Sequence, residues 1–394
     1  MFLKKNLNLI LVLFIFFLIG IITSAYKGYG DDLDSHALIL SYIGVYENGI
    51  YSPSRFYGSP VGELFYGFLG YNYGSFLGSF FSYIFFTCSI ILLLLGFSNK
   101  KINFNNILLF VVLCFSNPVL YLDNTNPSDY PLSLFFFSLG VYLFRKHEKL
   151  YSIIFFSLAI ATRANYALFI VIYLLYEIIL YKKDFKINLL ILTYSFLIAA
   201  LFYLPILIQN KLSLSFISNS GGPDLTLASL LPRFIYKIYI SLGVYSSIFL
   251  IFLIIYNFKK FKNLLVKNNN ILLIIFLNLA IFLFIPTKTA IISLLVILTY
   301  VLIFKLLNKK IYLFFLIFLN FIYFFSSYSI FSFEYKYNKK CSPVEAIDAK
   351  LDFKFSKGYF FERSIKMKNQ IECASIAFSN KSDKYILGKK IRSN

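Results

Sequence analysis

Long apolar segments follow one another along most of the chain, separated by short polar connections. Hydrophobic residues make up 59% of the 394 residues and charged residues only 14%, whereas a soluble chain carries about 25% charged residues. A helix of roughly 20 apolar residues crosses the hydrocarbon core of a bilayer, so the pattern predicts an all-α polytopic membrane protein with about eleven transmembrane helices. The expected helices span residues 7–26, 74–97, 105–121, 130–144, 150–162, 164–181, 187–208, 234–256, 270–286, 289–304 and 311–330.

Basic residues gather in alternate connections between these segments, and basic connections stay on the cytoplasmic side. The sequence therefore predicts an N-in, C-out protein of the plasma or inner membrane, with an uncleaved signal anchor as its first helix. The net charge of +20 then reflects topology and a basic tail, and no nucleic-acid partner is expected. The expected inner basic residues are Lys4, Lys5, Lys100, Lys101, Arg145, Lys146, Lys149, Lys182, Lys183, Lys186, Lys259, Lys260, Lys262, Lys267, Lys305, Lys309 and Lys310.

Two domains are expected: a transmembrane domain over 1–330 and a small extracytoplasmic α+β domain over 331–394. Residues 347–355 of the tail alternate apolar and charged side chains, which is typical of a half-exposed strand. Cys341 and Cys373 both lie in this tail, where a disulfide is permitted. The transmembrane domain contains a long first outer loop, 27–73, in which an apolar stripe predicts helices lying in the membrane interface.

Acidic residues cluster at the start of this loop, at Asp31, Asp32 and Asp34. One carboxylate there could simply cap a helix. A second carboxylate nearby raises the pKa of one of the two, which suits a general base that takes a proton from a hydroxyl. We expect Asp31 or Asp32 to be that base, and Asp34 to lie on a solvated helix face.

A divalent metal ion is a weaker expectation at the same place. Asp32, His36 and Glu63 offer oxygen and nitrogen ligands, but without a tight motif. A polar interface histidine is the plainer interpretation of His36. No other cofactor is predicted.

Basic residues of the expected outer loops could bind a phosphate: Arg55, Arg163, Arg233 and Lys288. Contact with lipid headgroups is the alternative for Arg55, and snorkelling to the interface is the alternative for Arg233 and Lys288. Arg163 lies at a tight connection where an unpaired charge is costly, so it needs a partner, either Asp129 or a substrate phosphate. Asp129 could otherwise bind sugar hydroxyls or cap a helix.

The chain resembles the GT-C membrane glycosyltransferases over roughly residues 1–300, most closely the bacterial branch related to protein O-mannosyltransferases and the lipid A aminoarabinose transferase. The resemblance rests on the acidic pair after the first helix, the run Gly-Ile-Tyr-Ser-Pro-Ser-Arg-Phe-Tyr-Gly-Ser-Pro-Val-Gly-Glu at 49–63, and the outer Asn-Pro…Ser-Asp loop at 117–129.

The resemblance implies transfer of a sugar from a polyprenyl-phosphate donor to a hydroxyl of a glycan, lipid or protein acceptor at the outer face of the membrane, usually with inversion. It places the base at Asp31 or Asp32 and a second acid at Glu63, with the four basic residues holding the lipid phosphate.

Two other functions stay open. One is a flippase or transporter of lipid-linked saccharide, and the other is an O-antigen ligase or polymerase. Helix interiors almost without ionisable groups disfavour an ion-driven transporter. The early position of the acids favours the transferase, because ligases typically carry their chemistry in a large late outer loop.

Overall fold

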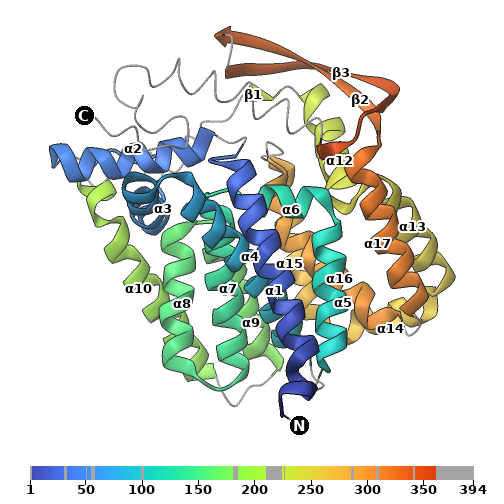
Figure 1. The fold of residues 1–394 in the computed structure, drawn as a ribbon. Helices are drawn as coiled ribbons and strands as arrows, with labels where there is room; N and C mark the ends of the chain where they lie inside the picture. The colour runs from blue at the N-terminus through green and yellow to red at the C-terminus, as the bar shows by residue number, and fades with distance from the viewer. Residues whose placement is uncertain are drawn as a thin grey trace.

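The structure is a computed structural model, and it is a helical bundle with a small sheet at one end (Figure 1). It describes residues 2–30, 33–49, 51–54, 58–98, 102–180, 185–209, 224–225, 227–284, 288–307, 310–339 and 342–360. We call the end of the bundle where the N-terminus lies the lower end, and the opposite end the upper end.

Most helices run between these two ends (Figure 1). They are α1 (Phe2–Lys27), α4 (Ser75–Gly96), α5 (Phe104–Ser116), α7 (Asp129–Arg145), α8 (Lys149–Thr162), α9 (Tyr166–Leu180), α10 (Phe185–Gln209), α13 (Val244–Tyr256), α15 (Asn269–Phe284), α16 (Ser293–Leu306) and α17 (Lys310–Phe325). The other helices lie near the two ends of the bundle: α2 (Leu33–Asn48), α3 (Pro60–Tyr73), α6 (Pro118–Asn124), α12 (Leu227–Leu242) and η2 (Thr289–Ile292) near the upper end, and α14 (Phe258–Lys267) at the lower end.

Several of these helices are long and apolar enough to cross a membrane, as in an integral membrane protein. Among the described residues, three helices meet this condition, Ser75–Gly96, Phe185–Ile208 and Thr289–Leu306, and up to six do if each bent pair of helices counts as one span. The apolar, largely α-helical class is thus confirmed. The number eleven and the N-in, C-out orientation stay predictions.

The core is centred on α16, which is apolar on all sides and almost entirely buried. A helix without a polar face is stable only where neighbours surround it. By contrast, α10 is about as apolar but mostly exposed along the side of the bundle, as expected for a helix that faces lipid. Composition alone does not separate these two helices, and their packing does.

Two of the helices expected from the sequence are broken. The segment expected over 105–121 bends by 86° between α5 and α6, and that expected over 234–256 bends by 87° between α12 and α13. The first break follows from Asn117, whose side chain caps α6 by accepting hydrogen bonds from two backbone amides, and from the proline after it. The second lies at Gly243, whose φ of +93° few residues other than glycine adopt.

One buried polar network joins the two breaks. The Asn117 amide donates to the Tyr300 hydroxyl at 2.9 Å and to the Ser241 carbonyl at 2.8 Å. The Tyr300 hydroxyl donates to the Leu242 carbonyl at 3.1 Å and accepts from the Asn320 amide at 3.2 Å. Carbonyls left free where a helix ends must find donors inside an apolar bundle. Asn117 and Tyr300 of α16 supply those donors, and Asn320 of α17 donates in turn to the Tyr300 hydroxyl.

The last expected helix, 311–330, ends earlier, at Phe325, because the chain then alternates apolar and polar residues with the period of a strand. β2 (Ser327–Lys339) and β3 (Ser342–Ser356) form an antiparallel hairpin above the bundle, and β1 (Asp224–Leu225) pairs in parallel with β3. The expected bridge between Cys341 and Cys373, and the tail beyond residue 360, lie outside the described residues.

The network at the breaks predicts unequal roles for two helix-capping asparagines. Asn117→Ala removes a cap and leaves buried groups without a partner, so it should lower the free energy of unfolding by about 2–4 kcal/mol. Asn103→Ala removes the cap of α5 at an exposed site and should cost about 0.5–1 kcal/mol. Thermal unfolding in detergent compares the two variants, and equal losses would contradict a special role of Asn117.

Candidate functional site

The chain leaves α1 through a turn that two glycines make possible. Gly28 and Gly30 have φ of +57° and +79°, a region open mainly to glycine. The Gly30 amide donates to the Lys27 carbonyl at 2.9 Å, and Ser79 of α4 donates to the Gly28 carbonyl at 2.5 Å. A Cβ atom at Gly30 would lie only 2.3 Å from the Asn126 side chain. The turn is therefore held tightly between α4 and the segment after α6.

The buried ammonium group of Lys27 ties this turn to the end of α6. It donates to the Leu122 carbonyl, and to the Thr125 hydroxyl at 2.7 Å. Next to these residues, Asp123 is buried and accepts a hydrogen bond from Thr289 in η2. Helix ends that are far apart in the sequence thus meet just beside the turn that follows α1.

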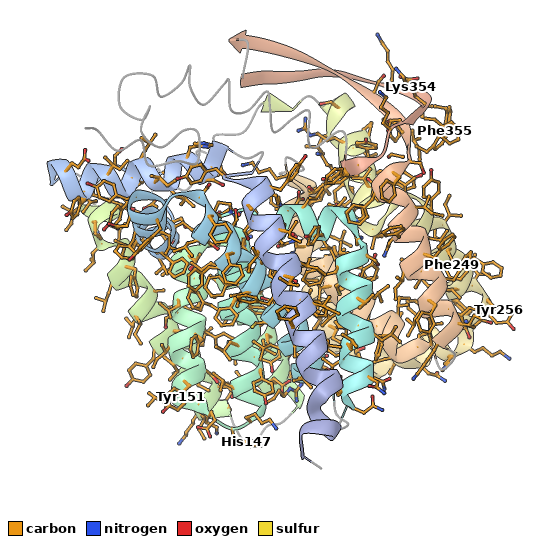
Figure 2. All side chains as sticks on the ribbon, viewed as in Figure 1. His147, Tyr151, Phe249, Tyr256, Lys354 and Phe355 are labelled. Atoms are coloured by element: carbon orange, nitrogen blue, oxygen red, sulfur yellow. The ribbon has the colours of Figure 1, made fainter. Side chains whose placement is uncertain are left out.

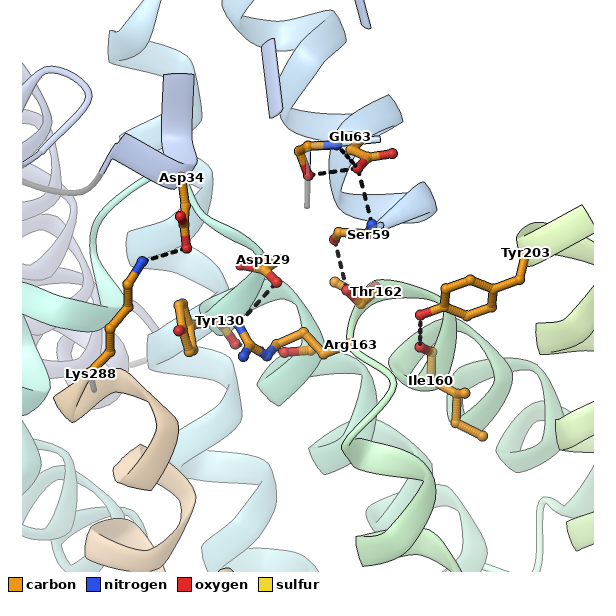
Figure 3. Close-up of polar contacts among 12 residues, drawn as sticks. Asp34, Ser59, Glu63, Asp129, Tyr130, Ile160, Thr162, Arg163, Tyr203 and Lys288 are labelled. Carbon is orange, nitrogen blue, oxygen red and sulfur yellow. Dashed lines mark hydrogen bonds and ion pairs between the residues drawn. The ribbon is translucent and has the colours of Figure 1, made fainter. Parts of the chain in front are cut away.

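Asp34, in the first turn of α2, forms an ion pair with Lys288 (Figure 3). The carboxylate oxygen and the ammonium nitrogen are 2.5 Å apart, and the two side chains are 25% and 37% exposed. The sequence predicts a solvated helix-face position for Asp34; the side chain is partly exposed, and in addition a cation 254 positions later in the sequence packs against it. Its partial exposure leaves Lys288 within reach of an anion from outside the protein.

Of the two partners expected for Arg163, Asp129 or a substrate phosphate, the structure shows Asp129. The guanidinium donates to the Asp129 carboxylate at 3.0 Å and lies over the Tyr130 ring at 3.7 Å from its centre (Figure 3). Both charged side chains are almost completely buried. A buried pair of this kind is stable only when both charges keep their partners. The adjacent Ser128 makes no side-chain capping hydrogen bond to α7.

Glu63 is buried in α3 and organises the connection between α2 and α3. Its carboxylate accepts hydrogen bonds from the Tyr51 hydroxyl at 2.5 Å, from the Ser54 amide and hydroxyl at 2.8 and 2.6 Å, and from the Ser59 amide at 3.0 Å. Burial and the Glu63 charge raise the pKa of the Tyr51 phenol far above its usual value, so this phenol stays protonated as a donor. The Ser59 hydroxyl donates to the Thr162 carbonyl at 2.7 Å, next to Arg163.

The geometry indicates a positioning role for Glu63. Four donors surround its carboxylate, and its side chain is buried, so it holds Tyr51, Ser54 and Ser59 in place. Arg55 lies between Ser54 and Ser59 in the sequence but outside the described residues. Asp31 and Asp32 also lie outside them; the described residues on either side are Gly30, against Asn126, and Leu33, which begins α2 next to Asp34.

The remaining expected residues lie apart from one another. His36 is buried on α2 with its ring 5.1 Å from that of Tyr29, and Arg233 is buried on α12. Within the described part of the chain, no group of three or more His, Cys, Asp and Glu residues could hold a metal ion.

Comparison with protein-family models, with curated proteins and with solved structures finds no match to this chain. The functional argument therefore rests on the site alone. At the upper end, one accessible ion pair, Asp34 with Lys288, lies close to a buried framework in which Glu63, Asp129 and Arg163 are fixed by their partners (Figure 3).

Sequence reasoning did not predict the contacts of Lys27 with the end of α6 or the hydrogen bond from Thr289 to Asp123. A signal was present for Lys27, since a lysine that ends an apolar helix commonly turns to the helix carbonyls or to the interface.

The Asp129–Arg163 pair predicts strong coupling between two substitutions. Asp129→Leu or Arg163→Met alone leaves one buried charge and should cost about 3–5 kcal/mol of unfolding free energy. The double variant removes both charges and should cost clearly less than the two single losses together. Unfolding of all four proteins in detergent measures this coupling, and simple additivity would show that the pair is not a unit.

Proposed function

We propose that this protein is a membrane glycosyltransferase that moves a sugar from a polyprenyl-phosphate-linked donor to an acceptor hydroxyl. The observation that carries the proposal is the ion pair between Asp34 and Lys288. It brings the acidic start of the first outer loop to a cation that an anionic ligand can reach. In such a reaction the general base and the phosphate-binding group must lie close together. The base acts on the hydroxyl that attacks the anomeric carbon, and the phosphate-binding group acts on the phosphate that leaves the same carbon.

The proposed chemistry divides the charges by their accessibility. Asp31 or Asp32 takes the proton of the acceptor hydroxyl as its oxygen attacks the anomeric carbon, and the bond from that carbon to the donor phosphate breaks. Lys288 exchanges its Asp34 partner for a phosphate oxygen and stabilises the charge of the departing lipid phosphate. Arg163, already bound by Asp129 and Tyr130, supports the site from beneath.

The other residues expected to bind substrate have different roles in this proposal. Glu63 holds Ser54 and Ser59, which are described on either side of Arg55, and in this proposal Arg55 contacts the donor phosphate or a lipid headgroup. Arg233, buried on α12, is a further phosphate candidate. The acceptor is a glycan, a lipid or a protein, and the reaction takes place on the extracytoplasmic side in the expected topology.

Substitution of the acidic pair tests the base. Asp31→Asn and Asp32→Asn are made singly, and sugar transfer from a polyprenyl-phosphate donor is measured in reconstituted vesicles. Loss of the general base should lower kcat by about 10²–10⁴-fold in one of the two variants, while donor binding and thermal stability persist. Asp352→Asn, at an exposed strand position, is the matched control and should be fully active.

The same vesicles distinguish the rival functions. A flippase would move donor across the bilayer at an unchanged rate in both variants, without net sugar transfer. Transfer that continues in both Asp31→Asn and Asp32→Asn would remove the base from the proposal.

Substitution of Lys288 tests the phosphate ligand separately. Lys288→Met should raise the KM for the polyprenyl-phosphate donor by about tenfold, because one charge-assisted hydrogen bond to the phosphate is lost. Lys357→Met, at an exposed position beyond β3, serves as the matched control. An unchanged KM for Lys288→Met would show that Lys288 only holds Asp34.

A further inference from the structure

The β2–β3 hairpin carries an apolar face that the described structure leaves open. Leu351, Phe353 and Phe355 alternate along β3 and are 68%, 65% and 76% exposed. Tyr328 of β2 shares this face, with its ring centre 4.9 Å from that of Phe355 and 6.1 Å from that of Phe353. Large exposed aromatic side chains in water are unfavourable, and a two-stranded hairpin is marginal by itself. The face therefore points to a partner.

The base of this hairpin is fixed at the upper end of α17. Gly358, with φ of +91°, follows β3 so closely against the helix terminus that a Cβ atom there would lie 2.3 Å from the Phe325 carbonyl carbon. The rings of Tyr323 and Tyr359 are 5.5 Å apart, and those of Tyr26 and Phe360 are stacked at 5.9 Å. The hairpin thus starts at a defined height relative to the helices.

That height matters because α17 is short. Its 16 residues rise about 24 Å, less than the roughly 30 Å of a bilayer hydrocarbon core. A stripe of exposed phenylalanines recurs along one face of α17, and Phe355 of the hairpin lies above the upper end of this helix (Figure 2). The stripe consists of Phe314, Phe318, Phe321 and Phe325.

Strand geometry places the hairpin aromatics at the edge of the bilayer. Each strand residue advances about 3.3 Å, so Phe355 lies roughly 10 Å and Phe353 roughly 17 Å from the turn at Gly358, measured along the strand. The shortfall of α17 together with the headgroup layer is of the same order. Exposed Lys354 and Lys357 lie close to Phe353 and Phe355 in the sequence, and lysines on the aqueous side of an interfacial aromatic face attract anionic headgroups.

We propose that the face formed by Tyr328, Leu351, Phe353 and Phe355 binds the lipid interface at the upper end of the bundle, as a continuation of the lipid-facing surface of α17. The occupant is the headgroup and upper acyl region of the surrounding bilayer. Lys354 points to the opposite face of the strand and remains in water. This contact goes beyond the proposed transferase activity and does not depend on it.

The chain contains no tryptophan, so a single introduced tryptophan reports its own surroundings. Phe355→Trp is compared with the neighbouring Lys354→Trp in vesicles of phosphatidylcholine and phosphatidylglycerol, with and without lipids brominated on the upper acyl chain, and with aqueous iodide. Phe355→Trp should emit at shorter wavelength and lose emission at least about twofold with brominated lipid. Lys354→Trp should respond to iodide and not to bromine.

Each other outcome would overturn the proposal. Equal iodide quenching of both variants, without bromine quenching, would place the face in water. Protection of Phe355→Trp from both quenchers would mean that protein covers the face, for example a second copy of the chain. Phe353→Trp, on the same face, repeats the test if Phe355→Trp does not fold, and Tyr256→Trp on exposed α13 provides a lipid-facing reference (Figure 2).

Discussion

The hydrogen bonds of Asn117 determine how the upper end of this protein is built. Two helices bend by nearly a right angle inside an apolar bundle, which is possible only where the freed backbone groups find partners. Asn117 caps α6 with its carbonyl oxygen and satisfies the end of α12 with its amide. Tyr300 and Asn320 complete the network from α16 and α17. Because of this bend, α6 crosses the bundle and carries Asp123 to Thr289.

The site depends on the same requirement, applied to charges. In a bundle with few ionisable residues, each buried charge needs a defined partner, and the partners found here come from separate parts of the chain. Arg163 with Asp129 and Lys27 with the end of α6 form a rigid framework. Asp34 and Lys288 lie above it and remain partly exposed. The framework favours a fixed site, and the exposed pair is where an anionic substrate can compete.

Several features were correctly anticipated because they depend on local or compositional rules. Apolar segment length gave the helical bundle, and the cost of an isolated charge predicted that Arg163 has a partner such as Asp129. Alternation in 347–355 predicted a strand, which β3 confirms. The breaks at Asn117 and Gly243 were missed because both interrupt otherwise continuous apolar segments, and the contacts that stabilise them lie on α16 and α17.

The sequence by itself determined the class of this protein: apolar helices of membrane length, acids gathered just after the first helix, and a strand-forming segment after the last helix. These follow from side-chain polarity and its period along the chain. Only the tertiary structure decided that Asp34 meets Lys288, that Glu63 is enclosed by four donors, and that the two bends share one network. The reason is physical: which charges and carbonyls become partners depends on which helix ends meet, and packing of the whole bundle sets that arrangement.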